Sequence, residues 1–164
     1  MSAIAKATEI IKRFEGYHRK LSNGNAKAYL CPAGRATIGW GVTVYPWGQA
    51  VQLGDIITRE QAEEYLQDYI NSRCTPVLGQ IPLWFEMTDN QKAALYSFAY
   101  NTGEHFYQGK NRKTITELCD SPHRWTDRDY VRGVFLLYRN PGSAFEEGLK
   151  RRRTAEAELW LTEV

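Results

Sequence analysis

The chain has 164 residues, of which 43% are hydrophobic and 13% aromatic. A chain of this length can bury one hydrophobic core, so we expect a single domain over residues 1–164. Its net charge of +2 excludes the strong basic excess of dedicated nucleic-acid-binding proteins, and we expect no nucleic-acid partner.

Two further classes are excluded by the amino-terminal segment and the cysteines. Residues 1–14 carry charges every few positions, unlike a signal peptide or a membrane span, so we expect no membrane insertion and a protein that begins in the cytoplasm. Cys31, Cys74 and Cys119 are an odd number without metal-ligand spacing. This pattern argues against a disulfide framework and a structural zinc site, and we predict free thiols and neither metal nor cofactor.

Helix starts are marked by Ser or Thr followed three residues later by Glu or Gln, a capping box that satisfies free amides at a helix N-terminus. The boxes are Thr58 with Gln61, Thr88 with Gln91, Ser143 with Glu146 and, more weakly, Thr126 with Asp129. Gly103 is typical of a helix stop. Together with the spacing of apolar residues, these signals predict helices over 2–14, 58–73, 88–102, 111–119, 126–139 and 143–161.

Residues 16–57 have a different character, because Gly, Asn, Pro and aromatic residues interrupt any helical period. The β-favouring stretches 28–30 and 36–40 flank a turn at 31–34 and predict a small hairpin sheet. The fold class is therefore α+β and mostly helical. We expect a β-rich lobe over about 16–57, a helical lobe over about 74–164 that includes the N-terminal helix, and a substrate cleft between them.

Several motifs appear in a fixed order. Phe14-Glu15-Gly16 is followed by Ala28-Tyr-Leu-Cys-Pro-Ala-Gly34 and Thr37-Ile-Gly-Trp-Gly41, then by the stretches 54–63, 94–103 and 148–156. This series resembles the phage-type lysozymes, or endolysins, of glycoside hydrolase family 24, whose signature is a Glu, then an Asp or Cys, then a Thr. The resemblance covers nearly the whole chain and implies a two-lobed lysozyme fold with the 58–73 helix as the connector.

The resemblance implies a muramidase that hydrolyses the β-1,4 bond between N-acetylmuramic acid and N-acetylglucosamine in bacterial peptidoglycan. Glu15 would be the catalytic acid, Cys31 the second catalytic residue, and Thr37 would help to hold the attacking water. The chemistry agrees, because glycoside hydrolysis needs an acid that keeps its proton near neutral pH, and a partly buried carboxyl does so. Asn101 and Arg152 are the expected substrate-binding residues.

Some assignments stay open at this level. Asn101 could instead cap its helix, and either Arg151 or Arg152 could pair with Glu15 from the last helix. The basic run 150–153 is typical of a solvated helix face. Gly39 and Gly41 favour close backbone approach beside the cleft rather than phosphate binding. Among the five Trp residues, which include candidate sugar-stacking platforms, we expect at least three to be buried.

The chain departs from the family pattern between Glu15 and Cys31. The separating residues 16–30 are more numerous than usual and include Ser22-Asn23-Gly24-Asn25, which suggests an extended hairpin turn beside the cleft. Cys31 itself is unusual, since an ordinary thiol is mostly neutral at pH 7 and a poorer base than a carboxylate. It could act through Thr37 and a water, or be a turn residue without a role.

Two other functions compete with the muramidase. A cysteine-dependent cell-wall peptidase or amidase would use Cys31 as nucleophile and His18 or His105 as base. A catalytically silent peptidoglycan-binding protein would keep the fold without the reaction. In each case we expect peptidoglycan as partner, a monomer, and residence in the host cytoplasm until release to the periplasm and cell wall. The sequence decides neither the stereochemical outcome nor a transglycosylase product.

Overall fold

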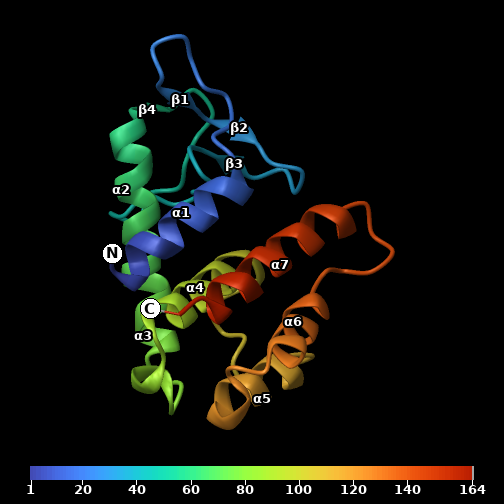
Figure 1. The fold of residues 1–164 in the computed structure, drawn as a ribbon. Coiled ribbons are helices and arrows are strands. Elements are labelled where there is room, and N and C mark those ends of the chain that lie inside the picture. Colours follow the sequence, from blue (N-terminus) through green and yellow to red (C-terminus); the bar gives the residue numbers. More distant parts are fainter. Residues whose placement is uncertain (164) are drawn as a thin grey trace.

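The computed structural model describes residues 1–163 and has a helix, a small β region and then a series of helices. The β strands and their turns lie at one end of the molecule, α2 runs along one side, and α4 to α7 gather at the other end (Figure 1). Within residues 1–163, no helix is both long and apolar enough to span a bilayer.

Helix α1 (Ala3–Glu15) begins at Ser2, whose hydroxyl accepts a hydrogen bond from the Ala5 amide at 3.2 Å. It ends at Gly16, which adopts φ +73°, a conformation that side chains with a Cβ rarely adopt. The helix therefore stops immediately after Glu15. Its buried face packs against α4, which fixes the direction in which its last residue leaves the helix.

The β region consists of two separate two-stranded antiparallel sheets. Strand β1 (Ala26–Lys27) pairs with β4 (Ile56–Ile57), and β2 (Tyr29–Leu30) pairs with β3 (Ala36–Thr37). The predicted hairpin around residues 31–34 is confirmed. The extended turn at residues 22–25 is present as well, closed by the Leu21 amide on the Asn25 carbonyl at 2.7 Å and by pairing of Lys20 with Ala26.

Helix α2 (Arg59–Tyr69) begins with the predicted capping box of Thr58 and Gln61. It continues as a π-helical turn over Ile70–Cys74 and then as α3 (Thr75–Leu78), so the helical rod extends beyond the predicted end at residue 73. Pro76 lies in the first turn of α3. Because proline has no amide hydrogen, the wider π turn before it removes the need for one regular helical hydrogen bond.

Four helices form the other lobe: α4 (Asp89–Thr102), α5 (Lys113–Asp120), α6 (Arg128–Leu136) and α7 (Glu146–Leu161). The predicted capping box of Thr88 and Gln91 starts α4, and Gly103 ends it. Most of α4 is buried, with α1 packed on one side and α7 on another. The central helix thus ties the N-terminal helix to the C-terminal one.

Two predicted helix starts are wrong in detail. Helix α6 is capped by Asp127 rather than Thr126, because the Asp127 carboxylate accepts a hydrogen bond from a first-turn amide. The expected box of Ser143 with Glu146 does not form: the Ser143 hydroxyl donates to the Asn140 carbonyl, and α7 begins only at Glu146. The Glu146 carboxylate instead accepts hydrogen bonds from the Gly142 amide and from the Arg139 guanidinium.

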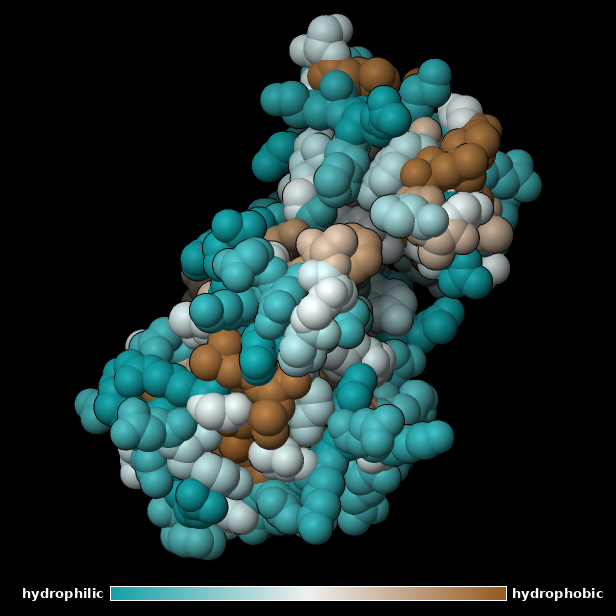
Figure 2. Space-filling view, turned by 90° about the vertical axis from the view of Figure 1, so that its right-hand side faces the viewer, coloured by the Kyte–Doolittle hydropathy of each residue, from teal (hydrophilic) through white to brown (hydrophobic). Residues whose placement is uncertain are grey.

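The core contains ten of the 21 aromatic residues, and several partly buried tyrosines pack against it. Four of the five Trp residues are buried, as predicted, and Trp47 alone among them is exposed. Phe98 of α4 contacts Phe106, Phe135 and Tyr138 through edge-to-face rings. The face of the molecule drawn in Figure 2 is mostly hydrophilic, and its hydrophobic side chains form separate patches toward the two ends of the molecule.

Candidate active site

Glu15 lies where α1 ends and the chain turns toward the β region. Its side chain is 24% exposed, so the carboxylate is shielded on most sides and still reaches solvent. It lines a cavity of about 1740 Å³ whose walls are formed mainly by α1 and α7. A shielded carboxyl at a lobe junction is the arrangement that a general acid needs.

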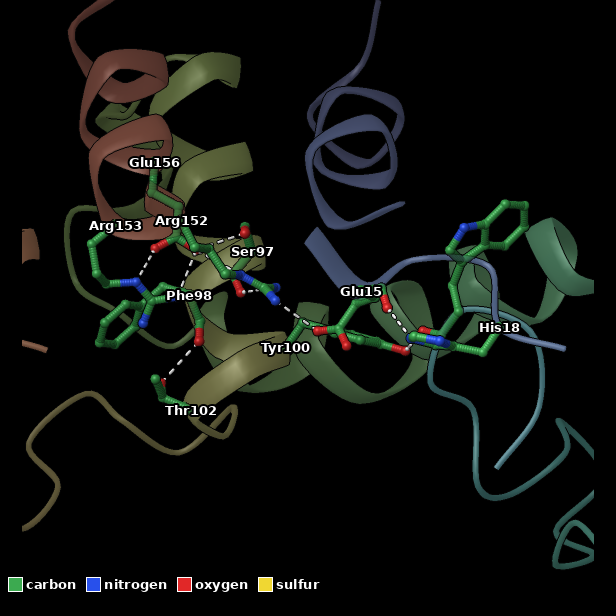
Figure 3. A network of polar contacts seen from close by, with 10 residues as sticks. Glu15, His18, Ser97, Phe98, Tyr100, Thr102, Arg152, Arg153 and Glu156 are labelled. Carbon is green, nitrogen blue, oxygen red and sulfur yellow. Dashed lines mark hydrogen bonds and ion pairs between the residues drawn. The ribbon is translucent and has the colours of Figure 1, made fainter. Parts of the chain in front are cut away.

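Arg152 of α7 is the residue that pairs with Glu15. Its Nη1 lies 2.7 Å from Glu15 Oε1, and its Nη2 donates to the Ser97 carbonyl at 3.1 Å (Figure 3). The Arg152 side chain is 5% exposed, whereas Arg151 is exposed. The sequence left these two arginines undecided, and the structure selects Arg152.

Behind Arg152 lies a buried ionic network (Figure 3). Glu156 Oε2 accepts from the Ser97 hydroxyl at 2.6 Å and lies 3.4 Å from Arg152 Nε, while its Oε1 lies 2.6 Å from Arg153 Nε. Burial raises the pKa of Glu156 and lowers the pKa of Arg153, and their mutual attraction opposes both shifts. The network fixes Arg152 and, through it, one oxygen of Glu15.

This network corrects the prediction for the basic run at residues 150–153. Lys150 and Arg151 are exposed as expected of a solvated face, but Arg152 and Arg153 are buried. Arg153 places its guanidinium 4.9 Å from the centre of the Phe98 ring. Half of the run therefore belongs to the site and the core rather than to the surface.

The β region approaches Glu15 at Gly41, and Tyr100 of α4 lies beside the same glycine. A Cβ placed on Gly41 would lie 3.4 Å from both Glu15 Oε2 and the Tyr100 hydroxyl oxygen. Tyr100 of α4 donates its hydroxyl to the Trp40 carbonyl at 2.8 Å, which joins the helical lobe to the β region beside the acid. The close backbone approach predicted for Gly41 is present.

The other predicted glycine, Gly39, approaches α2. A Cβ on Gly39 would lie 3.0 Å from the Ala62 Cβ, and the residue has φ +63°. Any side chain at this position would therefore be strained and would push α2 away. This contact sets the spacing between the connecting helix and the strands that carry the second predicted catalytic residue.

Cys31 lies at the first position of the β2–β3 turn, is partly exposed and is a free thiol. The amide of Arg35, followed by that of Ala33, lowers the pKa of the Cys31 thiol. Thr37 lies beside it on β3, is buried, and donates its hydroxyl to the Arg35 carbonyl at 2.9 Å. The turn thus favours the thiolate, which answers part of the objection that an ordinary thiol is a weak base.

The remaining cysteines differ from Cys31 in their surroundings. Cys74 and Cys119 are both buried free thiols, and burial raises their pKa, in Cys74 to about 12. They therefore stay protonated and unreactive at neutral pH. Only at Cys31 do the surroundings shift a cysteine of this chain toward its reactive form.

Tyr29 connects the two predicted catalytic residues. Burial raises the pKa of its phenol, and the negative charges of Glu15 and Cys31 both add to that effect, so the ring lies within electrostatic range of each. The His18 ring lies 5.2 Å from the Tyr29 ring, and its Nε2 is 2.8 Å from the Glu15 carbonyl oxygen. Since a carbonyl only accepts, this nitrogen must carry a hydrogen.

Asn101 is the penultimate residue of α4 and is exposed on the wall of the cavity that contains Glu15. The end of α4 is capped by the Gly103 amide, which donates to the Ala99 carbonyl at 2.8 Å. Within residues 1–163 the Asn101 side chain makes no hydrogen bond. Its geometry therefore leaves it available to a ligand and gives no support to a capping role.

The requirements of the rival chemistries are not met by the contacts seen in the described residues. No hydrogen bond in that part of the chain joins Cys31 to His18 or His105, and the Nε2 of His18 is bound to the Glu15 carbonyl oxygen at 2.8 Å. The same residues contain no group of three or more His, Cys, Asp or Glu side chains placed to hold a metal ion.

Comparison with known proteins agrees with this geometry. A family model described as phage lysozyme matches residues 12–156. The chain belongs to the phage lysozyme family. The family resemblance drawn from the motifs around Glu15, Cys31 and Thr37 is thereby confirmed, and the matched range includes Asn101 and Arg152.

This member of the phage lysozyme family is similar to individual phage endolysins. An endolysin of Acyrthosiphon pisum secondary endosymbiont phage 1 is 38% identical over 101 residues, which cover 60% of this chain and 58% of that endolysin. The match thus spans little more than half of that relative's length. The endolysin from Escherichia coli O157:H7 phage FAHEc1 has 26% identity and a TM-score of 0.72, covering 100% of this chain and 96% of that one.

Two further solved structures confirm the α+β lysozyme fold. A point mutant of P22 lysozyme matches with 24% identity and a TM-score of 0.73, covering 99% of both chains. The active form of the P1 phage endolysin Lyz matches with 24% identity and a TM-score of 0.70, covering 95% of this chain and 83% of that one. At this identity the likeness shows the fold alone.

Several residues of the site were missed by sequence reasoning. Tyr29 and Tyr100 lie inside the motif strings but carry no signal that separates a site tyrosine from a core tyrosine. Ser97 and Glu156 likewise look like ordinary helix residues. The spacing of Arg152, Arg153 and Glu156 on one helix turn does permit i,i+3 and i,i+4 ion pairs, and this was the available signal.

Proposed function

We propose that this protein is a muramidase that hydrolyses the β-1,4 bond between N-acetylmuramic acid and N-acetylglucosamine in bacterial peptidoglycan. The observation that carries the proposal is the position of Glu15: it ends α1 at the lobe junction, lines the large cavity and is held through one oxygen by Arg152. Membership of the phage lysozyme family and the endolysin relatives support the same conclusion.

In the proposed reaction, Glu15 donates a proton to the glycosidic oxygen while positive charge builds on the sugar ring. Arg152 holds Oε1, which leaves Oε2, on the Gly41 side, as the oxygen that faces the bond to be cut. The leaving sugar departs with the proton from Glu15. Water adds its oxygen to the anomeric carbon and gives a proton to a base.

Cys31 and Thr37 are the proposed groups on the water side. The amides of the β2–β3 turn lower the pKa of the Cys31 thiol and so increase the thiolate fraction near neutral pH. The Thr37 hydroxyl, fixed by its bond to the Arg35 carbonyl, keeps lone pairs with which it can hold a water. Cys31→Asp should keep or increase activity, because a carboxylate is the stronger water-activating group at neutral pH.

Asn101 and Arg152, which line the same cavity as Glu15, complete the proposal as substrate-side residues. We further propose that residues 1–164 work as a single lysozyme domain and as a monomer, with the cleft between the β-rich and helical lobes. The partner is peptidoglycan, which the protein would reach after release from the host cytoplasm. The endolysin relatives support this setting.

The test uses purified peptidoglycan with wild type, Glu15→Gln and Cys31→Ser, and measures new reducing ends and new free amino groups in parallel. A muramidase yields reducing ends, and Glu15→Gln should lower their rate by a factor of about 10² to 10⁴. A cysteine peptidase would yield amino groups that disappear with Cys31→Ser. Binding of the wild type without either product would leave the catalytically silent binding protein.

A further inference from the structure

The β region carries a positive charge that no nearby acid balances. Between Glu15 and Asp55 the sequence contains four Lys or Arg residues and no acidic residue, although the whole chain has 19 acidic residues. Since the net charge of the whole chain is only +2, the rest of it is slightly negative. This uneven distribution turns the β region toward a negatively charged partner.

The cations of the β region are free at the surface. Asp55, the acid at its edge, is already engaged, because its Oδ2 accepts hydrogen bonds from the Tyr45 hydroxyl at 2.8 Å and from the Gln52 amide at 3.0 Å. Within residues 1–163, no carboxylate lies within 4.0 Å of the exposed cations Arg19, Lys20, Lys27 and Arg35. Their charge is therefore open to a ligand.

Three of these cations share a pocket with apolar side chains. The pocket has a volume of about 550 Å³ and is lined mainly by Arg19, Lys20, Lys27, Leu21, Tyr29 and Leu30. The Lys27 amide donates to the Arg19 carbonyl at 3.2 Å, and Lys27 is the cross-strand partner of Ile56. Because cross-strand partners point to the same face of a sheet, the exposed side chains of Lys27 and Ile56 lie side by side.

This end of the molecule is placed to meet a surface. In Figure 1 the turn that precedes β1 forms the tip of the molecule, at the end opposite α5. Figure 2 shows hydrophobic patches among hydrophilic side chains at the same end. Four large apolar side chains of the β region are each more than half exposed: Leu30, Trp47, Leu53 and Ile56. The β region thus offers cations and apolar side chains together.

Free cations beside exposed apolar and aromatic side chains suit the interface of an anionic bilayer. The stems of Lys and Arg lie along apolar surface while their charged ends reach lipid phosphates. A soluble polyanion would match the cations but leave Leu30 and Ile56 in water. A neutral apolar partner would bury the cations without counter-charges, which is costly.

We propose that the β region docks on the surface of a bilayer that contains anionic phospholipids. The docking surface consists of Arg19, Lys20, Lys27, Leu30 and Ile56. The three cations receive lipid phosphates, and the two apolar side chains reach the boundary between head groups and acyl chains. The contact is peripheral and needs no membrane-spanning segment. It does not depend on the muramidase reaction.

The experiment measures binding to vesicles of equal parts phosphatidylglycerol and phosphatidylcholine, and to vesicles of phosphatidylcholine alone, by co-sedimentation. The variant Arg19→Gln/Lys27→Gln removes two cations of the docking surface. The matched control Arg73→Gln/Lys110→Gln removes one exposed Arg and one exposed Lys outside the β region. Both variants carry the same net charge, so a difference between them reports the position of the cations.

Wild type should partition onto the anionic vesicles about a hundredfold more strongly than onto the neutral ones, and added salt should weaken this binding. Each basic residue near an anionic surface contributes about fivefold, so Arg19→Gln/Lys27→Gln should lower the partition coefficient about thirty-fold. The control should stay within about twofold of wild type, because its cations lie away from the surface.

A second pair of variants tests the apolar part of the docking surface without a change of charge. Leu30→Ser should lower binding to the anionic vesicles by about three- to tenfold, whereas Leu137→Ser, which alters another exposed leucine, should have little effect. Circular dichroism confirms that each variant is folded.

Three results would overturn the docking surface. The first is a wild type that does not bind anionic vesicles at low ionic strength, and the second is an equal loss in both double variants. The third is equally tight binding of soluble polyphosphate with no effect of Leu30→Ser, which would replace the bilayer by a soluble polyanion.

Hydrolysis of lipid-free peptidoglycan separates this proposal from the reaction, because Tyr29 lines the pocket and also lies near Glu15 and Cys31. Arg19→Gln/Lys27→Gln should hydrolyse it at the same rate as the control, and a loss confined to that variant would make the pocket part of the substrate site instead. A wild type that binds the anionic vesicles but cuts no peptidoglycan would support the docking surface and overturn the muramidase alone.

Discussion

Glu156→Gln is the substitution whose effect on stability the structure defines most sharply. Glu156 is fully buried, accepts a hydrogen bond from Ser97 at 2.6 Å and neutralises Arg153 at 2.6 Å and Arg152 at 3.4 Å. Together with Glu15, the network contains two carboxylates and two guanidinium groups. Glutamine keeps the shape but leaves two buried guanidinium groups with the single carboxylate of Glu15.

Removing one partner of a buried ion pair costs about 3–5 kcal/mol, because the other charge remains desolvated without compensation. We therefore expect the free energy of unfolding to fall by about 3–5 kcal/mol. For a chain of this size each kcal/mol corresponds to about 2–4 °C, so Tm should fall by roughly 6–20 °C.

The assay is urea unfolding at neutral pH followed by circular dichroism, with Glu64→Gln, an exposed glutamate of α2, as the matched control. The control should change the free energy of unfolding by less than about 0.5 kcal/mol. The double variant Glu156→Gln/Arg153→Met should lose much less free energy of unfolding than the sum of the two single variants. The reason is that it no longer contains the buried Arg153 guanidinium that Glu156→Gln alone leaves without its carboxylate. A loss below about 1 kcal/mol for Glu156→Gln, with an unchanged m-value, would refute the reasoning.

Three further predictions concern the site. Because turn amides lower the pKa of Cys31, its alkylation in the folded protein should have a pH midpoint below that of the unfolded chain, and a midpoint at or above it would contradict the assignment. Tyr100→Phe leaves the Trp40 carbonyl unpaired and should cost about 1–3 kcal/mol in urea unfolding; a neutral effect would argue against the contact between the lobes. Gly39→Ala adds a Cβ 3.0 Å from that of Ala62 at φ +63° and should lower stability by about 2 kcal/mol or more, whereas a stabilised protein would mean that α2 is farther away.

The sequence predicts the helices best where the deciding interaction is local. The capping boxes at Thr58 and Thr88 form as expected, because each joins groups three residues apart. The box at Ser143 fails because Glu146 meets Arg139 and a loop amide instead, partners that the local pattern does not show. The π turn after α2 directly precedes the first turn of α3, which contains Pro76, and the pattern that predicts a helix over 58–73 does not include this proline.

The site is predictable in part. The motif order identifies the family and places Glu15, Cys31 and Thr37, while the pairing of Arg152 with Glu15 needs the packing of α7 against α4 to be decided. Arg153 and Glu156 escape prediction for a physical reason: a run of basic residues usually lies on a solvated face, and only the tertiary fold places half of this one in the core.

The central claim, that Glu15 is the acid of a muramidase, is tested most directly by the masses of the products released from purified peptidoglycan by wild type and Glu15→Gln. The account predicts muropeptides with hydrated, reducing muramyl ends from the wild type and none above background from the folded variant. Products of peptide-bond cleavage, or equal amounts of reducing muropeptides from both proteins, would contradict it. Products with anhydro-muramyl ends would show that the enzyme is a transglycosylase rather than a hydrolase.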